Sequence, residues 1–590
     1  MYKFTLNYIN TTESELQSQI DIINAYPMSD SVKETLIEEA RNNATINYEV
    51  IYPPIGWEDI QLAFSRSDLF GGVFRKWTAG IKFVKEDKTL IENLIDLRGL
   101  NFTINIEIEL YNDLLSKYET IFTGIANLSD YKIEQDSVQL SFEDGSMQQA
   151  LINAAKTKLK IGGEYNLNGV KTYSPTYETI TIKGIAANTT SYAIYPDELF
   201  RFLLSAIGIE PWRFKSEYFQ RVATGAYYNG KGAHRMIVKG DWLRGYTHTE
   251  SGVSTSFNDL FTSFKNIFGL HAGFETDQIS GITYLRVEPY EYFWEKNTMF
   301  TLDYVAELSK EIDMDLHPKS ITVGYNKFEE DNDLGQVEYN AKTQYTLPYK
   351  AFEKDMPMLS IYRADATGIE KLRNTPKDTD PNKSKKEDNE IFIISINLET
   401  KQSIANDVDY FESISNIYGA SPLYINCDMT PARSAIRWSP FYMAGLMRSD
   451  DRAKYLNIQS SERKSSIITR LATDTFYIYD NKDIRLTDLQ APFFTGYKLK
   501  FTAPVTNEII QYLTYNQYGL VKFWDYFKNR YSFGFLIECS TEPIDKSTNW
   551  ELREVAYYDE VPIEEEPNYL LLENGNYLLL ENKGLILLEQ

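Results

Sequence analysis

Polar and apolar residues alternate without a break in the stretch Thr103-Ile104-Asn105-Ile106-Glu107-Ile108-Glu109-Leu110. Successive side chains of a β-strand point to opposite faces, so the three isoleucines would share one face. The stretch therefore predicts a strand that is buried on one side, and partner strands are expected in the residues around it.

Strand-like patterning continues on both sides of this stretch. The chain turns to strands from Ile46, similar runs lie around residues 121–126 and 131–142, and a helix is expected near Met147–Ala155. We therefore expect one compact β-rich domain over residues 45–160.

A separate N-terminal segment, residues 1–44, precedes this domain. Residues 1–8 have the pattern of a strand, without the apolar core and cleavage site of a secretory signal, so we expect synthesis in a cytoplasm. The capping box Thr12-Glu13-Ser14-Glu15 opens a predicted helical hairpin over residues 12–41.

Two amphipathic helices and a hairpin are expected in the middle of the chain. The first helix begins at Pro196 and ends at Gly208, and the second begins near Ser256 and ends at Gly269. The second helix has an aromatic stripe that is better explained as part of the core than as a ligand site. The stripe includes Phe257, Phe261, Phe264 and Phe268. A hairpin over 270–275 and 282–288 follows, and the missing βαβα rhythm makes residues 161–310 an α+β domain.

Residues 311–555 are expected to form a β-rich domain that a mobile loop interrupts. The loop, 373–390, holds no apolar residue except proline, so it can bury little. Strand-like stretches at 359–362 and 391–396 flank it, which predicts that the loop connects neighbouring strands.

Length and composition fit this division. A chain of 590 residues suggests three or four domains at ~150 residues each, and 43 Tyr and 32 Phe against 31 Gly favour strands and interfaces. The expected fold class is α+β, β-rich and multidomain, with antiparallel sheets or barrels and a few short amphipathic helices.

The charge balance disfavours two classes of partner. With 84 acidic and 60 basic residues the net charge is −24, and such a field repels phosphate backbones and anionic membranes. No stretch approaches the ~18 apolar residues of a membrane-spanning helix. We expect neither stable nucleic-acid binding nor a membrane anchor.

The sequence provides few candidates for chemistry. Cys427 and Cys539 lie far apart and fit buried free thiols, and the four histidines form no zinc motif. The best cluster is Asp313-Met314-Asp315-Leu316-His317, because an extended chain would place two carboxylates and an imidazole on one side; an exposed polar strand face explains it equally well. The calcium-like run at Asp378 has Lys383 and Asn389 where the glycine and the bidentate glutamate belong, so we reject it.

Catalytic, cofactor and metal residues are therefore not assigned. Phosphate-binding loops and a GxSxG nucleophile turn are missing from the sequence. A glycosidase needs only a pair of carboxylates, which 84 acidic residues leave unidentifiable, so a cell-wall hydrolase stays open.

The last segment, 556–590, combines the acidic spacer Glu564-Glu565-Glu566-Pro567 with a Leu-rich repeat. The units begin at Asn568, Asn576 and Leu585, and each reads as a short strand, too small and apolar to fold alone. They should stack on each other and on a neighbour. The candidate interface residues are Tyr569, Leu571, Tyr577, Leu579 and Leu587.

Several motifs in consistent order carry a family resemblance. They are Pro54-Ile55-Gly56-Trp57-Glu58-Asp59-Ile60-Gln61-Leu62-Ala63-Phe64-Ser65-Arg66, then Gly71-Gly72-Val73-Phe74 and Ile81-Lys82-Phe83-Val84, with further matches at 320–325, 362–365 and 429–433. The chain thereby resembles large virion proteins of phages that infect Bacteroidota, including crAss-like phages. The C-terminal repeat is also similar to short repeats of phage tail proteins, whereas the hairpin at 12–41 departs from the pattern.

The resemblance implies a non-enzymatic virion protein of the tail hub, tail tip or baseplate. Its expected partners are further copies of itself in a symmetric ring and other tail proteins, namely tube, fibres and receptor-binding proteins, and it implies no catalytic residue. One alternative is a glycan-binding adhesin that stacks sugars on Trp294 or on Tyr290-Glu291-Tyr292-Phe293, and another is a tail-associated cell-wall hydrolase.

Overall fold

Most of the chain has a described conformation. The computed structural model describes residues 2–9, 20, 37, 45–59, 61–99, 104–112, 117–144, 147–161, 173–183, 187–221, 229–277, 282–326, 342–347, 353–364, 366–375, 377, 388–403, 410–412, 427–442, 457–460, 468–470, 478–479, 483–485, 489–515, 517–541 and 547–555. The C-terminal repeat at 568–590 lies outside these residues, as does the hairpin at 12–41 except for Ile20 and Ile37, which are helical and buried.

Residues 61–144 form a first unit of five antiparallel strands and one helix. Its elements are β3 (Gln61–Arg66), β4 (Val73–Val84), α3 (Lys85–Arg98), β5 (Ile104–Asn112), β6 (Lys117–Ile133) and β7 (Ser137–Asp144). They lie in the sheet in the order β3-β4-β7-β6-β5, and β1 (Tyr2–Ile9) and β2 (Thr45–Glu49) extend it beyond β5.

The alternating stretch at 103–110 forms most of β5. Its three isoleucines are buried, while Glu107 and Glu109 on the other face are half-buried, so the prediction is confirmed. The run at 131–142 was expected to continue as strand, but it is broken by a turn at 134–136, where β6 ends and β7 follows. α4 (Met147–Ala154) confirms the helix expected there.

A second unit comes from the other half of the chain. Its elements are β17 (Ala306–Ile312), β27 (Phe494–Pro504), α10 (Asn507–Tyr515), β28 (Leu520–Asp525), β29 (Arg530–Thr541) and β30 (Ser547–Val555). The order in the sheet is β17-β27-β30-β29-β28, with β16 (Thr298–Leu302) beyond β28. This order matches the first unit strand for strand, and both units place their helix after the second strand.

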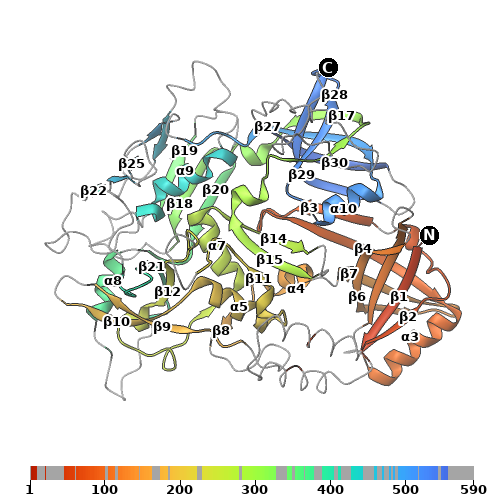
Figure 1. Ribbon diagram of the computed structural model, residues 1–590, viewed down its shortest axis with the longest axis horizontal. Helices are drawn as coiled ribbons and strands as arrows, with labels where there is room; N and C mark the ends of the chain where they lie inside the picture. The colour runs from red at the N-terminus through yellow and green to blue at the C-terminus, as the bar shows by residue number, and fades with distance from the viewer. Residues whose placement is uncertain are drawn as a thin grey trace, which may run out of the picture.

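The two units join edge to edge into a sheet of 13 strands, the joined sheet, because β3 of the first pairs with β29 of the second. In Figure 1 the first unit lies at the right in red and orange, with the blue strands of the second unit above it. One apolar core, which includes Phe83, Ile91, Phe501 and Leu513, covers a face of both units. Strands from four of the segments expected as separate domains meet in this sheet, and that division stays a prediction.

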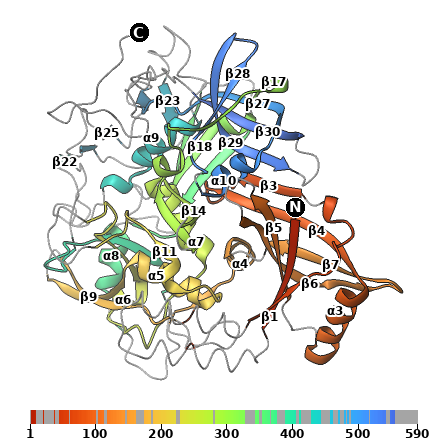
Figure 2. The same ribbon diagram turned by 45° about the vertical axis from the view of Figure 1, so that its right-hand side comes forward.

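The central part of the chain packs helices against small sheets. Its elements are β8 (Leu159–Lys160), β9 (Tyr177–Ile182), β10 (Thr189–Ile194), α5 (Pro196–Ala206), β11 (Phe214–Lys215), β12 (Arg235–Lys239), α6 (Gly240–Leu243), β13 (Ser254–Thr255), α7 (Phe257–Phe268), β14 (Leu270–Thr276) and β15 (Thr283–Pro289). Figures 1 and 2 both show α5 and α7 to the left of the first unit.

Both central helices and the hairpin confirm the sequence predictions. Ser256 caps α7 by accepting a hydrogen bond from the Asp259 amide, and Gly269 ends it in the left-handed conformation. The phenylalanine stripe of α7 is buried in the central core, as the core interpretation required.

A third part lies between β17 and β27. Its elements are β18 (Ser320–Tyr325), β19 (Thr343–Thr346), β20 (Asp355–Ser360), α8 (Ala366–Arg373), β21 (Ile391–Ser395), β22 (Tyr410–Glu412), α9 (Pro431–Tyr442), β23 (Asn457–Ser460), β24 (Ile468–Arg470), β25 (Ile478–Tyr479) and β26 (Ile484–Arg485).

The loop at 373–390 does not connect neighbouring strands. β20 pairs with β18 in a five-stranded sheet, whereas β21 pairs with β12 in a four-stranded one. One isolated bridge between Arg363 and Phe392 joins the two segments. The prediction was wrong because both flanking stretches are apolar strands, and apolarity alone does not specify the sheet; residues 376 and 378–387 of the loop lie outside the described ones.

The fold class is as expected: α+β, rich in strands, and mostly antiparallel. The described parallel strand pairs are β11–β15, β16–β28 and β18–β20. No helix in the described part of the chain is long and apolar enough to cross a bilayer.

Candidate assembly edges and the cavity at the joint

The joint between the two units is a short antiparallel ladder. Leu62 to Ser65 of β3 pair with Glu538 to Thr541, the far half of β29, which β28 does not reach. Phe64 and Cys539 face each other there and are fully buried, and burial raises the pKa of the Cys539 thiol. The buried free thiol expected at Cys539 is confirmed.

The same two edges recur elsewhere in the chain. β17 holds the same position in the second unit as β3 holds in the first. In the same way, the far half of β6, Ala126–Ile133, corresponds to the far half of β29. Among described residues, β17 pairs with β27 alone, and β6 beyond Ile125 pairs with β7 alone. Each edge presents an exposed isoleucine: Ile133 is 54% exposed and Ile312 is 52% exposed.

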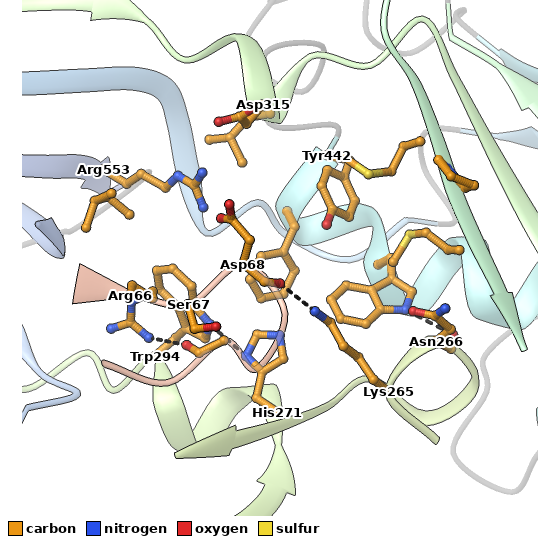
Figure 3. A pocket seen from close by; sticks show the side chains of 18 of the residues that line it. Arg66, Ser67, Asp68, Lys265, Asn266, His271, Trp294, Asp315, Tyr442 and Arg553 are labelled. Atoms are coloured by element: carbon orange, nitrogen blue, oxygen red, sulfur yellow. Dashed lines mark hydrogen bonds between the residues drawn. The ribbon is translucent and has the colours of Figure 1, made fainter. Parts of the chain in front are cut away.

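An open cavity of about 270 Å³ lies next to the joint, where the joined sheet meets the central part. Figure 3 shows the Asp68 carboxylate, the Lys265 amine and the Tyr442 hydroxyl pointing into it from three different elements. The turn between β3 and β4 forms one wall, the last turn of α7 another, and α9 a third, and His271 of β14 also lines the cavity.

Arg66, at the end of β3, makes hydrogen bonds to three separate segments of the chain in this region. Its guanidinium donates to the carbonyls of Leu536 (3.0 Å), Gly71 (2.8 Å) and Phe293 (2.9 Å), and it lies 3.8 Å from the centre of the Trp294 ring. These three carbonyls belong to the second unit, the first unit and the short 3-10 helix (Tyr290–Phe293) that follows β15. Burial without a carboxylate partner lowers the pKa of Arg66 to about 9.

The β3–β4 turn docks directly onto β14. The Ala272 amide donates to the Phe70 carbonyl (2.7 Å), and the Gly72 amide donates to the Ala272 carbonyl (3.1 Å). Gly71 has φ +82°, and a Cβ there would lie 2.4 Å from the His271 ring. The Gly71-Gly72 pair thus permits the contact between the joined sheet and the central part.

The polar groups of the cavity serve mainly as structural partners. The His271 Nδ1 accepts a hydrogen bond from the Trp294 indole (3.2 Å), and burial lowers the pKa of His271 well below 6.5. Its imidazole is therefore neutral, with the proton on Nε2. Lys265 donates to the carbonyls of Asp68 (2.7 Å) and Leu69 (2.6 Å), and burial lowers its pKa to about 8.

The cluster at Asp313–His317 does not form the face that the sequence suggested. Asp313 caps a short 3-10 helix, Met314–Leu316, so the chain is not extended, and Asp313 and His317 are buried rather than on an exposed strand face. The Asp313 carboxylate accepts from Arg553 (2.7 Å), and the His317 Nδ1 lies 2.8 Å from the Asp313 carbonyl. The described residues contain no group of three potential metal ligands.

The aromatic run proposed as a sugar platform is core. Tyr290, Phe293 and Trp294 are buried, and Trp294 contacts Phe494 and Phe535 at ring distances of 4.9 and 5.0 Å. The glycan-binding alternative required an exposed platform at Trp294, and that prediction is therefore wrong. The interface residues expected at Tyr569, Leu571, Tyr577, Leu579 and Leu587 lie outside the described part of the chain.

Sequence reasoning missed Arg66, the Gly71–His271 contact and the matching edges. The sequence signal for the first two is the spacing of Phe64-Ser65-Arg66 and Gly71-Gly72, which also carries part of the resemblance.

Comparison with known proteins finds solved structures of tail proteins that are similar to this chain. No protein-family model matches the chain, and no curated protein matches it. The tail protein from Neisseria meningitidis MC58 is 10% identical, covering 87% of this chain and 94% of its own, with a TM-score of 0.33. The 43 kDa tail protein of prophage MuSo2 from Shewanella oneidensis is 8% identical, covering 86% and 96%, with a TM-score of 0.34.

A third similar structure is the prophage tail protein gp18 from Listeria monocytogenes EGD-e, 8% identical over 86% of this chain and 91% of its own, with a TM-score of 0.30.

Proposed function

We propose that the chain is a structural protein of a phage tail, a ring subunit of the hub or tip that links the tube to fibres or receptor-binding proteins. The resemblance at Pro54–Arg66 motivates the tail assignment and extends it to phages of Bacteroidota. The ring is proposed because the chain contains two units with the same strand order, and the strand edges that join them inside the chain recur at β17 and at the far half of β6.

The contact inside one chain provides the pattern for the contact between chains. Within the chain, the first strand of one unit, β3, pairs with the far half of the fourth strand of the other, β29. The remaining first strand, β17, and the remaining far half, in β6, would pair in the same way between two copies. Such a head-to-tail contact adds copies in one direction and closes into a ring if the rotation permits it.

The character of these edges supports a specific partner. An unpaired strand edge is a template for other chains, and proteins usually protect it with charges, bulges or a cover. β17 has a bulge between Ala306 and Ser309 and exposed Lys310 and Glu311. These features restrict pairing to a strand of matching shape, whereas Ile312 adds apolar area to the contact.

The face of the joined sheet opposite its core suits the passage of DNA. Lys3 pairs with Glu109 (2.9 Å) in the first unit, and Lys498 pairs with Glu551 (2.9 Å) in the second. Amines that are neutralised by carboxylates hold phosphate weakly, and the net charge of −24 repels it. A ring with this face inward would let DNA pass without retaining it.

The ring is tested by placing a charge on each edge separately. Purified full-length chain should form rings by mass photometry and negative-stain imaging, and Ile133→Asp and Ile312→Asp should each reduce ring formation at least tenfold. Leu97→Asp is the matched control, because Leu97 is 82% exposed on α3 and belongs to neither edge strand. Its rings should form normally.

Mixing the two edge variants gives the decisive result. Each variant retains one intact edge, so a head-to-tail contact predicts that the mixture forms dimers and stops there. Rings from either variant alone, or a mixture that stays monomeric while the wild type forms rings, would contradict the proposed contact.

The C-terminal repeat completes the proposal. We propose that Tyr569, Leu571, Tyr577, Leu579 and Leu587 contact a neighbouring tail protein or another copy, since their apolar units need a surface to cover them.

A further inference from the structure

Two cations that line the cavity next to the joint, called the joint cavity below, are hydrogen-bonded to carbonyls rather than to carboxylates. The buried Arg66 guanidinium donates to three carbonyls, and among the described residues its Nη2 has no hydrogen-bond partner. The Lys265 amine donates to the carbonyls of Asp68 and Leu69. A cation that has lost water without gaining a counter-charge costs free energy, so both groups favour an additional anion.

The other two cations of the joint cavity are already paired with carboxylates. Arg553 donates to the Asp313 carboxylate (2.7 Å), and the Lys354 amine lies 2.6 Å from the Asp315 carboxylate. Each of these pairs is neutral as a whole. They leave the charge of the cavity to the remaining titratable groups of its lining.

Those remaining groups do not balance. Arg66 and Lys265 contribute two positive charges, and the Asp68 carboxylate, which points into the cavity with the Lys265 amine, contributes one negative charge (Figure 3). His271 is neutral because burial lowers its pKa well below 6.5, and Tyr442 is neutral because burial raises its pKa to about 12. The joint cavity therefore carries one excess positive charge, which a single carboxylate would neutralise.

The end of β30 lies at this cavity. Arg553 belongs to β30 and lines the cavity. Two residues later, Val555 pairs with Phe494, whose ring centre lies 4.9 Å from that of Trp294 and 5.6 Å from that of Phe441. Both of these rings line the cavity. Val555 is the last described residue, so the rest of the chain starts beside the joint cavity.

The sequence after Val555 is acidic with an apolar centre. Asp559-Glu560-Val561-Pro562-Ile563-Glu564-Glu565-Glu566, the acidic segment, has five carboxylates around three apolar residues and no cation. It lies outside the described residues. At up to ~3.5 Å per residue, Asp559 can lie as far as about 14 Å from Val555. The lining of the joint cavity is complementary, since it combines the two cations with Met356, Pro357 and Met358.

We infer that the acidic segment binds in the joint cavity of its own chain and places one carboxylate against Arg66 and Lys265. A carboxylate accepts strong hydrogen bonds from both a guanidinium and an amine, and one such group removes the excess charge. The apolar centre of the segment covers the methionines of the lining. Because the segment is tethered beside the cavity, its effective concentration exceeds that of carboxylates in solution.

This contact determines where the C-terminal repeat starts. The repeat begins at Asn568, two residues after Glu566, so an anchored acidic segment holds its first unit near the joint. The segment also connects the β3–β4 turn with α7 and α9, which form the walls of the cavity. The inference concerns the chain by itself and holds whether or not copies of the chain form a ring.

Zero-length crosslinking of the purified full-length chain tests the contact. A water-soluble carbodiimide joins an amine to a carboxylate that it touches, and peptide mass spectrometry identifies the pair. An equal mixture of isotopically heavy and light chain distinguishes a contact within one chain from a contact between copies. Lys265→Arg is the matched control, because it keeps the positive charge but lacks the reactive amine.

The expected result is a crosslink between Lys265 and a carboxylate of the acidic segment, always within one heavy or one light chain, that is lost in Lys265→Arg. Lys265 coupled only to Asp68, or to nothing, would contradict the inference. Crosslinks between a heavy and a light chain would show that a second copy supplies the carboxylate, and they would overturn it as well.

The reactivity of the Lys265 amine gives a second measurement. Acetic anhydride should acetylate Lys265 at least tenfold faster when the five acids of the acidic segment are changed to their amides, because the amine loses its cover and its charged partner. The changes are Asp559→Asn, Glu560→Gln, Glu564→Gln, Glu565→Gln and Glu566→Gln together.

The same kind of change in the repeat is the control. Glu573→Gln, Glu581→Gln and Glu589→Gln together should leave the acetylation rate of Lys265 unchanged. Both sets of substitutions follow Val555, so neither removes a side chain from the described cores. Equal rates in the wild type and both variants would refute the contact.

Discussion

Gly71→Ala should destabilise the contact between the joined sheet and the central part more than any other glycine substitution near the joint. Gly71 has φ +82°, where a Cβ is strained, and a Cβ would lie 2.4 Å from the His271 ring. The His271 ring cannot move aside easily, because it is buried among Trp294, Trp438 and Phe441.

The magnitude follows from two separate costs. A left-handed backbone angle costs an alanine about 1–2 kcal/mol. Forcing an extra methyl group into packed surroundings costs about 1–3 kcal/mol. Gly71→Ala carries both, so we expect a loss of about 2–5 kcal/mol.

Two control variants separate the costs. Gly245 has φ +91°, and a Cβ added there would meet no atom within 4 Å, so Gly245→Ala should show only the backbone cost. Gly72 has no positive φ, but its Cβ would lie 2.5 Å from the Ala272 carbonyl oxygen, so Gly72→Ala should show only the steric cost.

Urea unfolding followed by tryptophan fluorescence measures all three variants. Trp294 and Trp438 lie within 6.4 and 5.7 Å of the His271 ring, so their emission reports on this contact. The expected order of destabilisation is Gly71→Ala first, then Gly72→Ala and Gly245→Ala. If Gly71→Ala costs no more than Gly245→Ala, the turn does not pack tightly against His271.

Three further predictions concern other parts of the molecule. Arg66→Met should lower the free energy of unfolding by about 3 kcal/mol or more in the same assay, because three buried carbonyls lose a charged donor. Arg66→Lys should not restore this stability, and full stability of Arg66→Lys would argue against the three-way contact. Burial raises the pKa of Glu288 from 4.5 to about 7, so the folded protein holds the proton more tightly, and stability should fall by about 3 kcal/mol as the pH rises through that window. Glu288→Gln should flatten this slope in unfolding midpoints measured from pH 4.5 to 7, and an unchanged slope would exclude Glu288 as its origin. Deletion of residues 568–590 should impair tail assembly or the attachment of a partner, and an unchanged virion composition by quantitative mass spectrometry would contradict this.

Local patterns predicted local structure well. The alternation in β5, the stripe of α7 and the capping residues around both central helices depend on neighbours in sequence, and each is confirmed. The cluster at Asp313–His317 failed for the converse reason: Asp313 closes a turn and pairs with Arg553, which is 240 residues away in the chain.

The two matching units could not be predicted from the sequence. Their likeness lies in strand order and pairing, and residues 313–493 separate the first two strands of the second unit, whereas residues 67–72 separate those of the first. The role of Arg66 depends on carbonyls from three distant segments, so the side chain alone gave no indication of it. The aromatic run at Tyr290–Trp294 was equally ambiguous, because burial is set by the cores that meet there.

The position of the chain in the virion tests the central claim most directly. Purified phage particles that carry a gold-labelled tag on this chain, imaged by electron microscopy, should show the label at the distal end or hub of the tail. Label inside the capsid, or particles without the chain, would contradict the account.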